Sequence, residues 1–391
     1  MPITRRRFAA SLAAAGAPAA GGLDAAIRQS MDRNGVPCVT AMVANSKEVL
    51  YQGAFGTRDA GSAAPVKIDS IFGIASMTKA ITSVAALRLV EQKRVALDEP
   101  AERHLAELRG RQVLSGFDAK GRPVLRAPKR AVTLHHLLSH TSGLAYGLWD
   151  REVDRWSKSE GVTASTPQPL AFDPGTRWQY GQGIDVAGRL VERLSGLTLE
   201  DYFQRHILGP LGMDDTSFIL PASKFDRLVT GYRRQADGAL KPNERKQPDP
   251  PKSFNGGGGL YSTAPDYIRF GQLILRRGEG IFSPETYRLL STNQTGRLRA
   301  GILKTTNPAV SADMDVHPGA SDRYTLGFLL NPAPHVRGRA AGSLAWAGIS
   351  NTFYWIDPGS DRCAVIMMQF LPFVDPKAIA VLKDFEQAVY A

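Results

Sequence analysis

The sequence predicts an α/β fold of the α+β type, in which one antiparallel sheet is assembled from the two ends of the chain. Residues 37–44 and 48–55 are apolar, β-like runs separated by a short polar turn, which is the pattern of a hairpin. Further β-like runs follow residue 324, and mostly helical patterns lie between the two groups. Neither internal repeats nor a regular alternation of strands with helices is apparent.

The composition is that of a globular protein. With 391 residues the chain is long enough for about two domains. Its hydrophobic content of 43% and charged content of 22% are ordinary, and no apolar run is long enough for a membrane-spanning helix. The net charge of +11 is scattered and accompanies no nucleic-acid-binding motif. We therefore expect a basic solvated surface, no nucleic acid partner and no membrane span.

The first residues resemble an export signal. Residues 4–8 contain three arginines and a phenylalanine, an alanine-rich run follows, and Ala17-Pro-Ala19 offers a cleavage site. This pattern predicts a twin-arginine signal over residues 1–22 and a periplasmic or secreted protein. The alternative is an alanine-rich tail on a cytoplasmic protein.

The first folded elements are a short amphipathic helix over residues 23–33 and the hairpin described above. Cys38 lies in the first β-like run and Cys363 in the last. Their spacing is that of neither a metal site nor a redox motif, so we expect two free, buried thiols. A disulfide is the alternative for an exported protein.

A helix from Ser76 to about Gln92 carries the chemistry. Its middle, residues 80–87, has no charge on any face, which predicts a buried helix. Lys79 lies on the same face as Ser76, three residues away, and burial near a helix N-terminus favours its neutral amine, which could accept the proton of a serine nucleophile. The alternative interpretation is that Ser76 caps the helix and Lys79 is solvated.

The middle of the chain offers further candidates. His136 and His140 are four residues apart, but no glutamate follows the first, so we expect structural histidines and no metal site. Tyr146, beside Gly147, could line a pocket, although packing in the core is as good an interpretation. Tyr180 lies just before a helix over residues 184–194, where its side chain could point into a cleft.

The glycine-rich stretch 255–259 leads into a helix that Thr263 caps, with Asp266 three residues on. No Gly-Lys-Ser/Thr follows, so it is not a phosphate loop, and we expect the glycines to allow close backbone approach. The polar, proline-bearing stretch 233–251 reads as a surface excursion.

The chain closes with strands and a helix. The β-like runs are residues 324–330, 343–348, 351–356 and 363–369, and residues 357–361 form the turn between the last two. An amphipathic helix over residues 378–390 follows, with Ile379, Leu382, Phe385 and Val389 on one face.

Several of these stretches together resemble the serine β-lactamase and penicillin-binding-protein superfamily, and within it the class C-like family VIII carboxylesterases. The matching pieces, in the family's order, are Ser76-Met-Thr-Lys79, His140-Thr-Ser-Gly-Leu144, Trp178-Gln-Tyr180, Gly256-Gly-Gly-Gly-Leu-Tyr-Ser262 and Trp346-Ala-Gly348. The resemblance implies a class C β-lactamase-like fold, with an α/β part over residues 23–98 and 299–391 and a mostly helical part over residues 99–298. The active site would lie in the cleft between them.

The resemblance also implies the roles of individual residues. Ser76 would attack an ester carbonyl, and Lys79 and Tyr180 would serve as general base and proton relay, in an order that stays open. The backbone N–H groups of Ser76 and Ile349 would hold the oxyanion. Substrate contacts would come from Trp346, Ala347, Gly348, Tyr146 and Gln182, and no cofactor or metal is implied.

Departures from the family pattern narrow the substrate. Class C β-lactamases carry Tyr-Ser-Asn where this chain has Tyr180-Gly-Gln182, and Lys-Thr-Gly where it has Trp346-Ala-Gly348. The tryptophan replaces a cation that would pair with a β-lactam carboxylate, so small neutral esters are the predicted substrates. The alternatives are a transesterase or acyltransferase, or a β-lactamase or D-amino-acid peptidase using the same site.

Two other classes of function fit the sequence less well. A non-catalytic penicillin-recognising module should have lost Ser76, Lys79 or Tyr180, and all three are present. The chain contains no Gly-x-Ser-x-Gly motif, so no α/β-hydrolase elbow competes with Ser76.

Overall fold

The structure is a computed structural model that describes residues 20–163, 165–315, 319 and 321–391. The predicted export signal falls mostly on residues 1–19, which lie outside the described residues, and it stays a prediction. Helix α1 (Ala20–Asn34) begins within the last three residues of the predicted signal. It contains the amphipathic helix predicted over residues 23–33.

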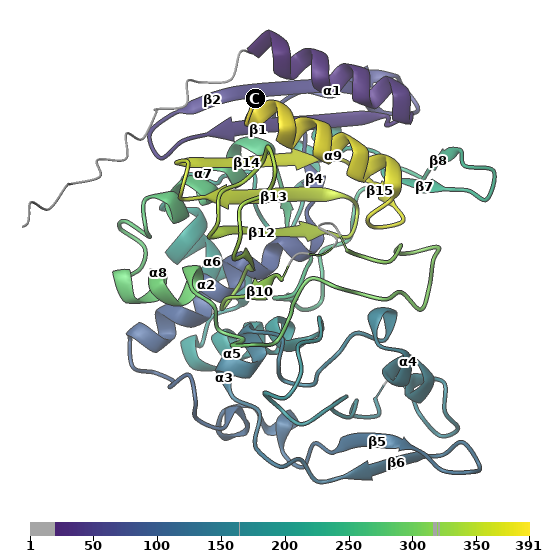
Figure 1. Cartoon of the computed structure of the whole chain (residues 1–391), viewed down its shortest axis with the longest axis vertical. Coiled ribbons are helices and arrows are strands. Elements are labelled where there is room, and N and C mark those ends of the chain that lie inside the picture. Colours follow the sequence, from purple (N-terminus) through teal and green to yellow (C-terminus); the bar gives the residue numbers. More distant parts are fainter. Residues whose placement is uncertain (1–19, 164, 316–318, 320) are drawn as a thin grey trace, which may run out of the picture.

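An eight-stranded sheet joins the two ends of the chain (Figure 1), which confirms the predicted fold class. Its order is β10-β11-β12-β13-β14-β1-β2-β3, and neighbouring strands are antiparallel throughout. Strand β1 pairs with β14, so the N-terminal hairpin adds directly to the C-terminal strands. The bounds are β1 Cys38–Ala44, β2 Val49–Asp59, β3 Ala64–Pro65, β10 Arg323–Tyr324, β11 Leu329–Asn331, β12 Ser343–Gly348, β13 Thr352–Asp357 and β14 Arg362–Met367.

Helices cover both faces of this sheet. On one face α9 (Pro376–Val389) packs beside α1, and the ring of Phe385 lies 5.5 Å from that of Trp355 on β13. On the other face α7 (Ala264–Leu275) packs on β14, where Gly271 lies against the side chain of Cys363. Alternation along the strands accounts for both contacts, because Trp355 and Cys363 point to opposite faces.

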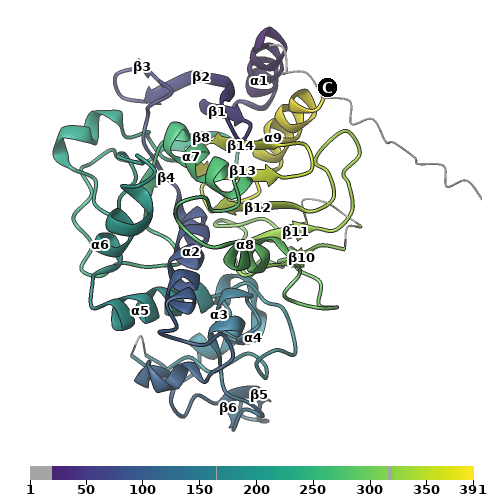
Figure 2. The same cartoon turned by 90° about the vertical axis from the view of Figure 1, so that its left-hand side faces the viewer.

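The predicted buried helix is α2 (Thr78–Glu91), which runs between the sheet and the helices below it (Figure 2). All of its residues from Thr78 to Leu87 are buried. It packs most closely on α5 (Gly183–Ser195), which ends at Gly196 in a left-handed conformation. The remaining helices are α3 Leu134–Leu138, α4 Arg151–Ser157, α6 Leu199–Phe203 and α8 Pro284–Ser291.

Short hairpins interrupt the part of the chain predicted to be helical. Strands β5 (Val113–Phe117) and β6 (Pro123–Arg126) form one of them. The predicted surface excursion contains another, β7 (Tyr232–Arg234) with β8 (Leu240–Pro242), and β15 (Phe370–Leu371) lies parallel to β7. The buried Tyr232 ring anchors this excursion, a tertiary contact that a polar composition did not indicate. The bounds of the two predicted domains stay a prediction.

The prediction of one strand over residues 324–330 was wrong. The chain forms two short strands, β10 and β11, around a turn in which the Phe328 N–H donates to the Thr325 side chain at 3.0 Å. Gly327 lies against α2, where a Cβ would sit 2.9 Å from that of Ser83. Close contact with the buried helix therefore bends a segment whose composition favours extended structure.

Both cysteines are free and buried, as predicted. They lie on two neighbouring strands, β1 and β14. Cys363 is aligned with Ala44, which lies six residues along β1 from Cys38. That offset is roughly 20 Å, and a disulfide needs Cα atoms within about 7 Å. The alternative of a disulfide is thus excluded.

No helix in the described part of the chain is both long and apolar enough to span a lipid bilayer.

Two short strands complete the fold. Strand β4 (Phe72–Gly73) pairs with β9 (Tyr261–Ser262), which ties the residues just before Ser76 to those just before α7.

The docking of α9 on the sheet generates a stability prediction. Phe385→Ala should lower the free energy of unfolding by about 3–5 kcal/mol, because it removes a fully buried ring packed on Trp355. Lys383→Ala, on the exposed face of the same helix, is the matched control and should change it little. Urea unfolding followed by tryptophan fluorescence measures both. Equal stability of the two variants would contradict the packing described here.

Candidate active site

Ser76 lies on a short 3-10 turn, Ala75–Met77, that leads directly into α2. Ala75 has a φ of +44°, a conformation that is unfavourable for a residue with a Cβ and that often marks functional sites. The Ser76 side chain makes no capping hydrogen bond to the helix. The alternative interpretation of Ser76 as a helix cap is therefore wrong, and its hydroxyl is free for another role.

Lys79 is completely buried, so the alternative of a solvated lysine is also wrong. Its Nζ donates to Ser76 Oγ at 3.3 Å, to Tyr146 Oη at 3.3 Å and, through a very short contact, to the carbonyl oxygen of Gly257. An ammonium group has three N–H donors, and here each has an acceptor. The arrangement fixes the amine beside the serine hydroxyl and also accommodates its protonated form.

A carboxylate lies two hydrogen bonds from Lys79. Tyr146 Oη donates to Asp185 Oδ2 at 2.6 Å, so its remaining lone pair faces the amine. Burial, and then the charge of Asp185, raise the pKa of Tyr146 well above its usual value, so Tyr146 stays a neutral phenol. The hydroxyl of Tyr146 thus connects the buried Lys79 amine with the carboxylate of Asp185.

Tyr180 lies against the same amine. It is 2% exposed, and Lys79 Nζ lies 5.0 Å from the centre of its ring. The Trp346 Nε1–H donates to Tyr180 Oη at 3.3 Å. Trp346 comes from β12, so the sheet and the helical part each contribute one partner to this pair.

Aromatic rings surround Tyr180 and bury His140. The His140 ring lies 4.8 Å from that of Tyr180 and 5.0 Å from that of Tyr324. Neither ring nitrogen has a hydrogen-bond partner among the described residues. Burial, and then the charge of Lys79, hold the pKa of His140 well below its usual value, so this histidine stays neutral. His136 instead forms a capping box with Thr133 at the start of α3.

The end of β12 touches the turn that carries Ser76. Gly348 lies so close to the Ile74 carbonyl that a Cβ would be 2.3 Å from its oxygen, so only glycine fits. Ile349 follows at once. Within the described residues, neither the Ser76 N–H nor the Ile349 N–H has a hydrogen-bond partner. An amide donor without a partner can stabilise a negatively charged oxygen that lies within its reach.

Two predicted site residues point elsewhere. Ala347 lies between Trp346 and Gly348 in β12, and strand alternation turns its side chain away from Trp346, toward its partner Phe353. Gln182 Nε2 donates to Gln168 Oε1 at 3.0 Å, and its side chain lines a different cavity. The roles predicted for both residues in substrate binding are not supported by a contact with Ser76 or Lys79.

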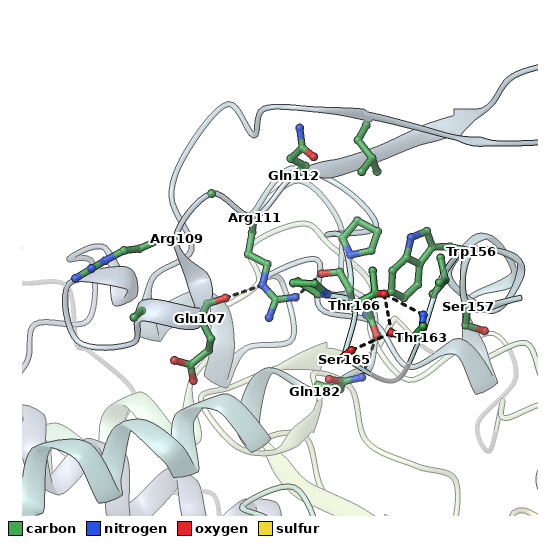
Figure 3. Close-up of a pocket in the computed structure, with 17 residues that line it drawn as sticks. Glu107, Arg109, Arg111, Gln112, Trp156, Ser157, Thr163, Ser165, Thr166 and Gln182 are labelled. Atoms are coloured by element: carbon green, nitrogen blue, oxygen red, sulfur yellow. Dashed lines mark hydrogen bonds between the residues drawn. The ribbon is translucent and has the colours of Figure 1, made fainter. Parts of the chain in front are cut away.

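The cavity beside Gln182 has a volume of about 1020 Å³ and is shown in Figure 3. Arg111 crosses its middle, where its guanidinium donates to the backbone carbonyls of Glu107 and Gln168. Ser76, Lys79 and Tyr180 do not line it. Its size alone therefore does not make it the place of the chemistry.

Sequence reasoning missed Asp185 and the carbonyl of Gly257. An acidic residue in the first turn of a helix is common because it complements the helix dipole, so Asp185 gave no distinct signal. Its position beside the apolar face of α5 was the one signal in the sequence that could have identified it. The glycines at 256–259 were correctly expected to allow close approach, since a Cβ on Gly257 would lie 2.1 Å from Asp185 Oδ2.

Comparisons with known proteins agree over nearly the whole chain. The model of the beta-lactamase family matches residues 23–387. Monacolin J acid methylbutanoyltransferase from Aspergillus terreus is 30% identical, over 94% of this chain and 95% of that protein. Lovastatin esterase from Penicillium rubens is also 30% identical, over 87% of this chain and 90% of that protein.

Solved structures give the same result. Simvastatin synthase from Aspergillus terreus, as the LovD6 mutant, matches with a TM-score of 0.82 and 29% identity, over 94% of this chain and 96% of that one. EstCE1, a hydrolase with promiscuous acyltransferase activity, matches with a TM-score of 0.71 over 95% of this chain and 98% of that one. At 21% identity the second match supports the fold alone.

The Lys79–Tyr146–Asp185 contacts generate a prediction about pH. Labelling of Ser76 by a fluorophosphonate should slow as the pH falls, because the base that takes its proton becomes protonated. Asp185→Asn removes the negative charge that Tyr146 links to Lys79, so labelling should fall off at a lower pH than in the wild type. The labelling rate should change in the same direction whether Lys79 or Tyr180 accepts the proton.

A matched control exists far from the site. Tyr51 Oη donates to Asp24 at 2.8 Å, so Asp24→Asn changes a similar tyrosine–aspartate pair between α1 and β2. Its labelling profile should coincide with that of the wild type. A profile for Asp185→Asn that also coincides with the wild type would show that Asp185 does not act on the pair.

Proposed function

This chain belongs to the beta-lactamase family, and we propose that it is a serine carboxylesterase that hydrolyses small esters through an acyl-enzyme on Ser76. The family membership makes it a serine enzyme, either a hydrolase or an acyltransferase. The observation that carries the finer proposal is the contact of the buried Lys79 amine with the Ser76 hydroxyl at 3.3 Å, beside Tyr180.

The first half-reaction forms the acyl-enzyme. Ser76 Oγ attacks the ester carbonyl carbon while its proton passes to the Lys79–Tyr180 pair. The carbonyl oxygen becomes an oxyanion that the N–H groups of Ser76 and Ile349 stabilise, each typically worth a few kcal/mol. The intermediate then collapses, the bond to the alcohol oxygen breaks, and the pair returns the proton to the leaving alcohol.

In the second half-reaction water is the nucleophile and Ser76 is the leaving group. A water molecule gives a proton to the same pair and attacks the acyl carbon. The bond to Ser76 Oγ breaks, and the serine takes the proton back as the carboxylic acid leaves. Asp185 and Tyr146 keep the amine in place during both halves.

The surroundings of Tyr180 favour neutral esters over β-lactams. A β-lactamase of class C carries a lysine where this chain has Trp346, and that cation pairs with the substrate carboxylate. Here the Trp346 indole packs 4.8 Å from the Tyr180 ring and donates to its oxygen, which leaves an apolar wall. A substrate without a carboxylate at that position loses no ion pair when tryptophan replaces the lysine.

The proposal is tested with p-nitrophenyl butyrate. Ser76→Ala should lower kcat by about three orders of magnitude or more, and Tyr180→Phe by about 100-fold or more, since each removes a group that the chemistry needs. Ser83→Ala is the matched control, because that serine is also buried on α2 and its hydroxyl has no partner among the described residues. Hydrolysis that persists in Ser76→Ala would refute the proposal.

An acyltransferase is the second candidate, and the names of the relatives favour it. An alcohol would then replace water in the second half-reaction, with the same proton transfers. Turnover of p-nitrophenyl butyrate with increasing 1-butanol separates the two by product analysis. Butyric acid as the main product at millimolar alcohol indicates the esterase, and butyl butyrate as the main product indicates the transferase.

A further inference from the structure

The hairpin of β5 and β6 carries a concentrated positive charge. Residues 109–130, which contain both strands and the segments beside them, include seven lysines and arginines and one acidic residue, Asp118. They therefore hold more than half of the chain's net charge of +11. In both views the hairpin lies at the end of the molecule opposite α1 (Figure 1, Figure 2). This part of the charge is thus gathered at one end of the protein, whereas the sequence indicated scattered charge.

Several of these cations can bind an external anion. Two ion pairs are formed within the segment's surroundings, between Arg122 and Asp118 and between Arg126 and Asp173. In the part of the chain that the structure describes, the following exposed residues have no carboxylate at ion-pairing distance: Arg109, Lys120, Lys129 and Arg130.

Apolar side chains are exposed among these cations. Val124 is 45% and Leu125 40% exposed, and both lie in β6. Successive residues of a strand point to opposite faces, so each face of the hairpin presents one of them. The outer edge of β6 has no partner strand among the described residues. Exposed apolar side chains set between lysines and arginines match a surface that is anionic outside and apolar beneath.

The hairpin is fixed to the body of the protein. The Arg155 guanidinium from α4 lies 3.9 Å from the centre of the Phe117 ring on β5. At the base of the hairpin, the Leu114 N–H donates to the Leu170 carbonyl at 2.9 Å, and the Lys129 N–H donates to Asp173 at 2.8 Å. The cations are therefore presented by an ordered backbone, and binding costs little ordering of the protein.

We propose that this hairpin attaches the protein to the surface of membranes that contain anionic phospholipids. The lipid phosphates pair with the exposed cations, and Val124 and Leu125 enter the boundary between headgroups and acyl chains. The attachment is peripheral and needs no membrane-spanning helix. The inference goes beyond the proposed function, because it concerns where the protein binds and not the reaction at Ser76.

Co-sedimentation of the full chain with vesicles tests the inference. The vesicles contain equal amounts of phosphatidylglycerol and phosphatidylcholine. The wild type should bind them in about 50 mM NaCl and at least tenfold more weakly in about 300 mM NaCl, because salt screens the charges. It should not bind vesicles of phosphatidylcholine alone, which carry no net charge.

A charge variant locates the binding surface. Lys120→Gln, Lys129→Gln and Arg130→Gln combined should weaken binding to the mixed vesicles by about tenfold or more, since each residue contributes separately. The matched control removes the same charge at the other end of the molecule, from the β1–β2 turn and α9, and should bind like the wild type. Its substitutions, all at exposed lysines, are Lys47→Gln, Lys377→Gln and Lys383→Gln.

An apolar variant distinguishes a membrane from other anionic partners. Val124→Thr keeps the β-branched shape but adds a hydroxyl, so it should weaken vesicle binding by about threefold. Val336→Thr is the control, because Val336 is 93% exposed and lies outside the hairpin, and it should leave binding unchanged.

Three results would overturn the inference. If the wild type does not bind the mixed vesicles, the cations serve only to keep the open edge of β6 from pairing with other chains. If the control lysines weaken binding as much as the hairpin variant does, binding follows net charge alone. If Val124→Thr binds vesicles like the wild type and the protein is retained equally well on heparin, the partner is a polyanion and not a membrane.

The test is independent of the proposed function. Without vesicles, kcat for p-nitrophenyl butyrate should be the same in the wild type and in the hairpin variants, because the substituted residues do not contact Ser76, Lys79 or Tyr180. Loss of vesicle binding with unchanged kcat therefore supports the attachment without bearing on the esterase. Failure of the esterase proposal would appear in Ser76→Ala and not in these variants.

Discussion

The burial of the Lys79 amine is the constraint on which the rest of the site depends. A cation removed from water is costly unless its donors are satisfied and a counter-charge is near. Three elements supply what is needed: the 3-10 turn provides Ser76, the glycine stretch provides the Gly257 carbonyl, and the loop after α3 provides Tyr146. Asp185 on α5 completes the set through Tyr146. The amine thus joins the 3-10 turn, the glycine stretch and the loop after α3.

The same constraint explains how the sheet and the helices meet. The stretch Thr78–Leu87 of α2 can be buried on all sides because its one ionisable side chain, Lys79, has its hydrogen-bond partners close by. The sheet approaches its first turn at Gly348, where any side chain would strike the Ile74 carbonyl, and it contributes Trp346 to the oxygen of Tyr180. The short pairing of β4 with β9 closes the other side. The site thus lies where the sheet and the helices meet, and both contribute polar groups that point into it.

Much of this could be read from the sequence. The antiparallel sheet from both termini, the buried helix, the free cysteines and the meeting of Ser76, Lys79, Tyr180 and Trp346 were all expected, because periodicity and ordered motifs carry that information. The contact of Asp185 with Tyr146, the contact of Gln182 with Gln168 and the strands around Thr325 could not be read from it. Each depends on a partner far away in the chain: Tyr146 turns an ordinary helix-start aspartate into a buried one, Gln168 draws the Gln182 side chain into another cavity, and α2 bends residues 324–330 at Gly327.

The central claim is that Ser76 becomes covalently acylated by an ester. Rapid mixing with p-nitrophenyl butyrate, followed by acid quenching, intact-protein mass spectrometry and peptide mapping, tests it directly. The account predicts a transient butyryl adduct on the peptide that contains Ser76, appearing with nitrophenol release and absent from Ser76→Ala. Nitrophenol release with no adduct at any mixing time, or an adduct that persists in Ser76→Ala, would contradict it.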